Sequence, residues 1–193
     1  MTLTLTGSQT VGPFFRRGLE RPQWSDLTTE GAAGQKIHIA GDLIDGQGEA
    51  VPDGLVEIWQ ANAAGKYAHP ADAQDKPLDA HFRGFGRVCT DAQGRFTFTT
   101  VLPGAVTDAN GIVHAPHINV SVFSRGLLKR LITRMYFSDH AAENAADPLL
   151  QSIGHDDIRH TLIGTRLDDV AAVPTYRFAI ILQGDGETAF LDV

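Results

Sequence analysis

The residue types best suited to chemistry stand in one alternating stretch, His117 to Phe123. Apolar and polar residues alternate strictly along it, which predicts a β-strand. Because successive side chains of a strand point to opposite faces, its apolar residues should share the core face. These are Ile118, Val120 and Val122. His117 and Asn119 share the other face. A histidine and an amide two residues apart on one face look like a metal-ligand pair in which one ligand has been replaced.

A second set of ionisable residues lies in the polar, Gly- and Pro-punctuated segment 62–86, whose length is typical of functional or disordered loops. It contains Tyr67, His69, Asp72, Asp75, Asp79 and His81. Their spacing matches no metal-ligand motif, so solvated loop polarity is favoured over a metal site. Glu57, in the strand before this loop, is either a half-buried acid or, as favoured, the partner of a neighbouring arginine.

Composition limits the classes of function. A chain of 193 residues is long enough for one sizeable core. The net charge of −7 argues against nucleic acid or an anionic membrane as partner. We see no apolar run of membrane-spanning length and no signal-peptide pattern. Cys89 is alone, which excludes an internal disulfide framework and predicts a small buried hydrophobe. Together these features favour the cytoplasm.

Short strands separated by turn signals predict an all-β fold, a β-sandwich with short peripheral helices and an extended N-terminal arm. Strands are expected at 36–43, 55–61, 87–90, 95–101, 117–123, 131–137, 176–183 and 189–193, the last two as a hairpin. Helices are expected within 139–152, which Pro148 interrupts, and within 156–167. We divide the chain into an arm, 1–35, and a sandwich domain, 36–193. The arm folds back on its own core or packs on a partner subunit.

Four motifs together resemble the intradiol ring-cleaving dioxygenases: Val56-Glu57-Ile58-Trp59-Gln60-Ala61-Asn62, Phe82-Arg83-Gly84-Phe85-Gly86-Arg87, Pro103-Gly104 and Ala115-Pro116-His117-Ile118. Three more extend the likeness over most of the chain: Ser8-Gln9-Thr10-Val11-Gly12-Pro13-Phe14, Phe123-Ser124-Arg125-Gly126 and Gln183-Gly184-Asp185-Gly186-Glu187-Thr188. Each motif alone is weak, but their order and spacing are specific. The fold that this resemblance implies is a β-sandwich.

The resemblance also implies an Fe(III) site made of two tyrosines and two histidines, the histidines as His-x-His on a strand. Ferric iron is a hard acid that phenolate oxygens and imidazoles suit. Here His117 stands at the first histidine position and Asn119 replaces the second. Gln74 and Val106 fall where the two tyrosines are expected. We therefore expect no metal ligand and no catalytic residue in this chain, His117 being a leftover ligand position. The Fe(III) would belong to a related iron-binding beta subunit.

In this family the active site lies where the two subunit types meet, and this chain is expected to supply part of the substrate pocket. The resemblance carries that role to Thr10, Gly12, Pro13, Phe14 and Arg125. The family's usual residue after Gly-Pro is tyrosine, so Phe14 lacks a hydroxyl there. Glycine lets the backbone approach a flat ring, and proline stiffens the loop. Arginine suits the carboxylate of an aromatic acid, although a surface or interface salt bridge is the alternative role.

The expected function is thus that of a subunit in a larger αβ oligomer that opens a dihydroxylated aromatic acid with O₂, the isolated chain being inactive. Two alternatives are a purely structural, degenerate subunit and a stand-alone β-sandwich module that binds a small molecule.

Overall fold

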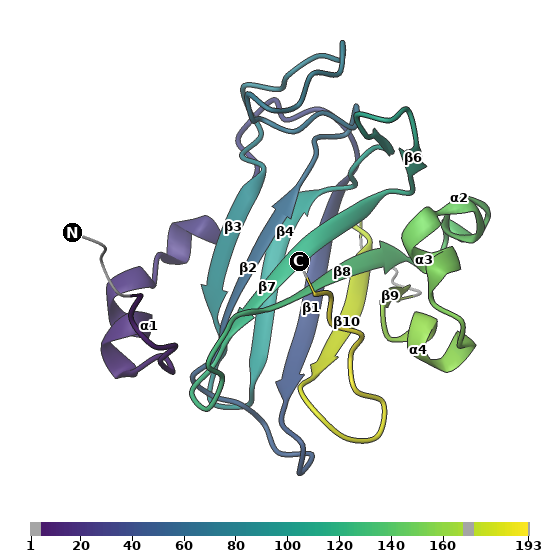
Figure 1. Ribbon diagram of the computed structural model, residues 1–193. Helices are drawn as coiled ribbons and strands as arrows, with labels where there is room; N and C mark the ends of the chain where they lie inside the picture. Colours follow the sequence, from purple (N-terminus) through teal and green to yellow (C-terminus); the bar gives the residue numbers. More distant parts are fainter. Residues whose placement is uncertain (1–4, 168–171, 193) are drawn as a thin grey trace.

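A computed structural model describes residues 5–167 and 172–192 (Figure 1). Residues 1–4 of the predicted arm and Val193 of the predicted hairpin lie outside the described residues. The strands are β1 Lys36–Ile44, β2 Leu55–Gln60, β3 Phe85–Cys89, β4 Arg95–Val101, β5 Val106–Thr107, β6 Val113–His114, β7 His117–Phe123, β8 Leu131–Phe137, β9 Ile163–Arg166 and β10 Thr175–Ile181. The helices are α1 Pro13–Leu19, α2 Ala141–Ala146, α3 Pro148–Ser152 and α4 Asp156–His160, with a 3₁₀ turn at Pro22–Trp24. None of these described helices is long and apolar enough to cross a bilayer.

Two four-stranded halves, β3-β2-β7-β8 and β9-β10-β1-β4, are joined where β8 pairs with β9. Apolar side chains from both halves form one buried cluster, with Val56 and Ile118 from the first half and Ile37, Phe98 and Phe178 from the second. The halves therefore face each other across a single core, and the helices α2, α3 and α4 lie at one side (Figure 1). The predicted all-β fold with short peripheral helices is confirmed.

The C-terminal part differs from its predicted topology. β10 pairs in parallel with β1 along its length and with β9 only at Tyr176 and Arg177. The predicted hairpin partner at 189–192 forms no strand with it: Thr188 N–H donates to the Ile181 carbonyl at 3.0 Å, but Leu191 N–H donates to the Ile132 carbonyl, 2.7 Å away. The predicted helix at 156–167 is wrong beyond His160, because Ile163–Arg166 is β9, the strand that joins the two halves.

The N-terminal segment is partly helical, so the prediction of an extended arm is wrong for residues 13–19. Gly12 is extended, with φ −98° and ψ 176°, but Pro13 begins α1 because the fixed φ of proline suits the first helical position. Farther along, Leu27 is buried in the core and the Trp24 ring meets the Phe85 ring edge-on at 5.7 Å. The segment after α1 thus packs on the chain's own sandwich.

Candidate functional site

The strand pair β2–β7 carries two polar regions, one at each end. The strands are antiparallel, with Trp59 opposite Asn119 near one end and Leu55 opposite Phe123 at the other. We call the region around His117 and Asn119 the His117 end, and the region beyond Phe123 the Arg125 end. The seven residues of β7 place these ends about 20 Å apart.

His117 is a buried, neutral histidine. The alternation predicted for β7 holds, because Ile118, Val120 and Val122 are in the core and His117 lies on the opposite face. Its Nδ1 lies 2.7 Å from the Ala115 carbonyl oxygen and therefore donates. Nε2 is then the acceptor for the Tyr67 hydroxyl, 3.3 Å away. Burial lowers the pKa of His117 to about 4, and the nearby Arg134 charge adds to this effect.

Asn119 turns its amide oxygen toward a cation. Its Nδ2 donates to the Tyr67 hydroxyl at 2.9 Å and to the Trp59 carbonyl at 3.2 Å. Its Oδ1 accepts from Nε of Arg134 at 3.1 Å. A continuous hydrogen-bond chain thus runs from the Arg134 guanidinium through Asn119 and Tyr67 to His117. Burial raises the pKa of Tyr67, so its phenol stays protonated within this chain.

Arg134, in β8, is a half-buried cation. Its NH1 lies 3.4 Å from His114 Nδ1 and 3.5 Å from the Tyr136 hydroxyl oxygen. No carboxylate oxygen of the described residues lies within 4.0 Å of its guanidinium. The Tyr136 hydroxyl donates to Oδ1 of Asp147 at 3.0 Å, and the other Asp147 oxygen accepts from Ala115 N–H at 2.9 Å. Asp147 therefore ties β8 to the start of β7.

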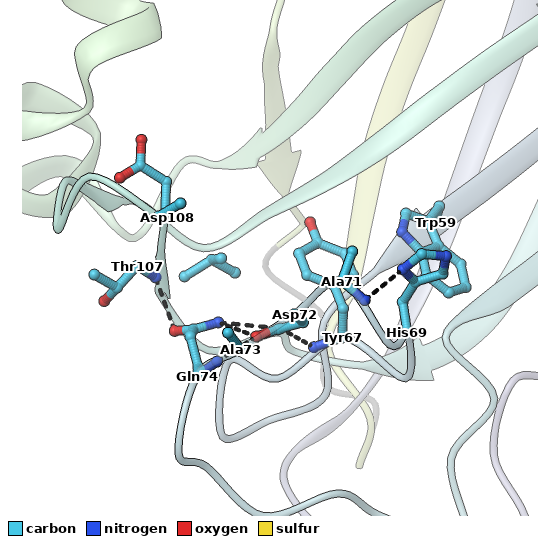
Figure 2. A pocket seen from close by; sticks show the side chains of 11 residues that line it. Trp59, Tyr67, His69, Ala71, Asp72, Ala73, Gln74, Thr107 and Asp108 are labelled. Atoms are coloured by element: carbon cyan, nitrogen blue, oxygen red, sulfur yellow. Dashed lines mark hydrogen bonds between the residues drawn. The ribbon is translucent and has the colours of Figure 1, made fainter.

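Tyr67 of this network also lines a cavity of about 530 Å³ (Figure 2). Its lining includes the stacked rings of Trp59 and Tyr67, whose centroids are 5.7 Å apart. Gln74 and Val106, the two positions where tyrosine ligands were expected, both line it. The Gln74 amide is already engaged, because its oxygen accepts from Thr107 N–H at 3.0 Å and its nitrogen donates to the Gly65 carbonyl at 3.0 Å.

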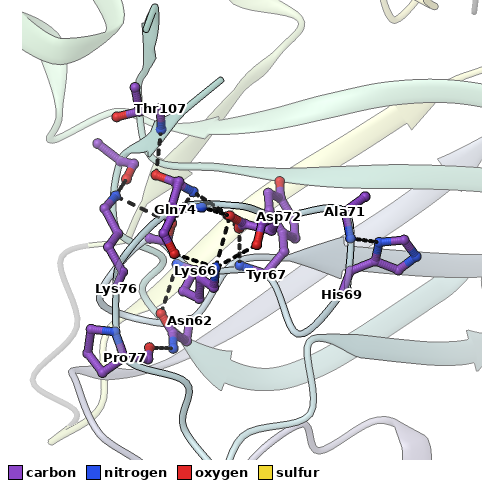
Figure 3. Close-up of polar contacts among 12 residues, drawn as sticks. Asn62, Lys66, Tyr67, His69, Ala71, Asp72, Gln74, Lys76, Pro77 and Thr107 are labelled. Atoms are coloured by element: carbon purple, nitrogen blue, oxygen red, sulfur yellow. Dashed lines mark hydrogen bonds and ion pairs between the residues drawn. The ribbon is translucent and has the colours of Figure 1, made fainter. Parts of the chain in front are cut away.

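The loop between β2 and β3 is held by its own polar side chains (Figure 3). Asp72 is nearly buried and accepts from the backbone N–H groups of Tyr67 at 2.8 Å and Gln74 at 2.9 Å. Nζ of Lys66 lies 3.2 Å from its carboxylate. Burial alone would raise the pKa of Asp72, but these hydrogen bonds bring it down to about 2. The interpretation as solvated polarity is therefore wrong for Asp72, which organises the loop.

These residues do not suit a ferric ion. The four positions where the family's ligands were expected hold a neutral imidazole, two amides and an alkyl side chain: His117, Asn119, Gln74 and Val106. Among residues 5–167 and 172–192, no three His, Cys, Asp or Glu side chains gather closely enough to hold a metal ion. The permanent charge of Arg134 on the Asn119 oxygen also repels a cation from this place.

At the Arg125 end, the structure brings together most of the predicted substrate-binding residues. Gly12, Pro13 and Arg125 line one cavity of about 540 Å³. The Thr10 hydroxyl accepts from Gly126 N–H at 2.8 Å, which pins the arm to the turn that carries Arg125. Phe14 is 81% exposed and lies outside the lining of this cavity.

Phe15, not Phe14, faces this cavity, and sequence reasoning missed it. Its ring lies 5.4 Å from the ring of Phe123, the last residue of β7. The Phe14-Phe15 pair is too apolar for a free tail, but only the helical phase set by Pro13 decides which ring turns inward. Asp53 and Arg16 were also missed, since each becomes a lining residue only through the fold.

Two smaller predictions concern β2 and β3. Nε of Arg87 donates to Glu57 at 2.7 Å, so the favoured pairing of Glu57 with an arginine is confirmed. Cys89 is half-buried rather than fully buried, because β3 is an edge strand of its half. Burial still raises the pKa of its thiol.

The fold and the two cavities can now be compared with known proteins. A family model described as "Dioxygenase" matches residues 11–184, and the chain belongs to this family, that of the intradiol dioxygenases. The chain is 42% identical to the protocatechuate 3,4-dioxygenase alpha chain of Pseudomonas putida, over 97% of this chain and 96% of that one. It is 38% identical to the beta chain of the enzyme of the same name from Burkholderia cepacia, over 80% of this chain and 67% of that one.

Solved structures show the same fold. Catechol 1,2-dioxygenase from Acinetobacter sp. ADP1 superimposes with a TM-score of 0.61 at 19% identity, over 87% of this chain and 60% of that one. At this identity the likeness concerns the fold alone. Iron is typical of the family.

Proposed function

We propose that this chain is the alpha-type subunit of a protocatechuate 3,4-dioxygenase and forms one wall of a substrate pocket whose Fe(III) is held by a beta-type partner. Its likeness to an alpha chain over nearly the full length of both supports this proposal. Relatives with separate alpha and beta chains support the partnership. In this arrangement the arm, 1–35, contacts the partner through its part before Trp24, residues 36–193 form the sandwich, and the αβ units assemble further in the cytoplasm.

One observation carries the proposal. The arm and Arg125 gather at one end of β7, whereas His117 and Asn119 lie at the other end, about 20 Å away. A ring of about 5 Å held near Arg125 cannot reach the His117 end of the same chain. A catalytic site that uses the Arg125 end must therefore be completed by another chain.

The reaction that we propose for the complex is the cleavage of 3,4-dihydroxybenzoate by O₂ to 3-carboxy-cis,cis-muconate. The iron of the partner supplies the oxidative chemistry. This chain binds and orients: the Arg125 guanidinium pairs with the substrate carboxylate, and the rigid Gly12-Pro13 backbone lies against the ring. The arm, whose Gly12 and Pro13 line the cavity, excludes water from it, which strengthens the pairing of Arg125 with its anion.

Co-expression with a beta chain of the family tests the proposal. We expect iron and ring-cleaving activity only in the αβ complex, and an Arg125→Ala complex should show a KM for protocatechuate raised by roughly tenfold or more. An Arg177→Ala complex is a control, since the exposed Arg177 pairs with Asp42 in the other half of the sandwich, away from this cavity. Unchanged KM and kcat for Arg125→Ala would instead support a purely structural subunit. Iron-dependent activity of the chain alone would refute the proposal.

A further inference from the structure

The turn before β2 and the turn after β7 meet at the Arg125 end. Leu55 is paired with Phe123 in the antiparallel register of the two strands. Asp53 precedes this pair by two residues and Arg125 follows it by two, so the register itself brings the two side chains together. Nε of Arg125 lies 3.2 Å from Oδ2 of Asp53. Both residues line the cavity that also contains Gly12.

The contact leaves the binding end of the guanidinium free. The shortest contact between Arg125 and Asp53 is through Nε, and neither terminal nitrogen of Arg125 donates a hydrogen bond to a described residue. Those two nitrogens form the planar fork that binds a carboxylate through parallel hydrogen bonds. The Arg125 side chain is 72% exposed, so the ion pair adds little to stability. Its effect is on the direction in which the guanidinium points.

The backbone beside Asp53 is held in place. Asp53 sits in the tight turn before β2, and the carbonyl of its neighbour Pro52 accepts from NH1 of Arg16 at 2.8 Å. Oδ1 of Asp53 is buried and has no hydrogen-bond partner among the described residues. A buried acceptor without a donor is unfavourable, so this oxygen does not contribute to the stability of the turn.

We propose that Asp53 is a positioning residue: it holds Nε of Arg125 so that the terminal nitrogens face the cavity and bind the carboxylate of an aromatic acid. This inference rests on the proposed function, because it assigns Arg125 the substrate carboxylate. Asp53 does not touch substrate. By restricting the long, exposed Arg125 side chain before substrate binds, Asp53 lowers the conformational entropy that this side chain loses on binding.

The test uses the assembled αβ complex and the steady-state kinetics of protocatechuate cleavage. The variants are Asp53→Asn, Arg125→Ala and the double variant. Asp42→Asn is a matched control, because Asp42 forms a comparably exposed pair with Arg177, at 2.9 Å, in the other half of the sandwich. We expect Asp53→Asn to raise KM by roughly fivefold to tenfold with kcat within about twofold, and Asp42→Asn to change neither. Should Asp53→Asn fail to assemble, Asp53→Ser should give the same KM effect.

The double variant separates positioning from a general structural role. If Asp53 acts through Arg125, the double variant has the KM of Arg125→Ala alone, because nothing is left to position. Two outcomes overturn the inference and leave the proposed function intact. In one, the increases in KM of the two single variants add in the double variant. In the other, Arg125→Ala raises KM while Asp53→Asn leaves KM unchanged or lowers it. An unchanged KM for Arg125→Ala overturns the proposed function itself.

Discussion

Arg134 is expected to be the main barrier to iron at the His117 end. If Asn119 is replaced by histidine, the chain still should not hold Fe(III) while Arg134 remains. An ion bound to a ligand at position 119 would lie about 2 Å from that ligand. Nε of Arg134 lies 3.1 Å from Oδ1 of Asn119, the atom whose place the new ligand atom would take, and the ion would lie on the opposite side of that atom. The two positive centres would therefore be about 5 Å apart.

This distance sets the size of the effect. Two unit charges 5 Å apart interact by about 3 kcal/mol at an effective dielectric constant of 20. A ferric ion with one phenolate ligand carries a net charge of +2, so Arg134 would oppose its binding by about 7 kcal/mol, or roughly 10⁵ in affinity. The Tyr67 hydroxyl and His117 Nε2 are 3.3 Å apart, a separation that two ligands of one ion can have.

Metal content after dialysis against Fe(III), together with the visible phenolate-to-iron absorption band, measures this effect. We expect Asn119→His to stay iron-free, the double variant Asn119→His/Arg134→Gln to take up iron and colour, and an added Tyr67→Phe to remove the colour. Arg125→Gln in place of Arg134→Gln is the control, since it removes a positive charge about 20 Å away. Stoichiometric iron in Asn119→His alone, or an iron-free double variant, would refute the reasoning.

Two further predictions concern stability, each measured by urea unfolding. Because burial lowers the pKa of His117 to about 4, the unfolded chain binds a proton there that the folded chain does not between pH 6.5 and 4. The contribution of this difference to the free energy of unfolding is complete above pH 6.5 and falls by about 3 kcal/mol as the pH drops to 4. His117→Gln should remove this part of the pH dependence. Asp147→Ala should lower the unfolding free energy by about 3 kcal/mol, because it removes the cap of α3 and leaves the Tyr136 hydroxyl and Ala115 N–H without their acceptor. Asp91→Ala, in an exposed turn, should cost only about 1 kcal/mol, and an equal loss in both variants would contradict the assigned role of Asp147.

Local patterns of the sequence predicted most of the sandwich strands. The alternation from His117 to Phe123 determined which residues enter the core, because side chains of a strand alternate between faces whatever lies beyond. The pairing of β10 with β1 and the strand β9 were missed. These are contacts between segments far apart in the chain, and their parallel register leaves no hairpin signal between them.

In the candidate site, too, the sequence predicted local features but not the contacts between distant segments. The sequence by itself determined the residue types: an amide in place of the second histidine, a Gly-Pro pair in the arm and an arginine after β7. Only the tertiary structure decided what these residues meet. Arg134 reaches Asn119 because β8 pairs with β7, and Asp53 reaches Arg125 because β2 pairs with β7 at the other end. The chemistry of a side chain depends on its residue type alone, but its neighbours depend on the register of the strands. That register is fixed by the whole core, because one face of each strand must be buried.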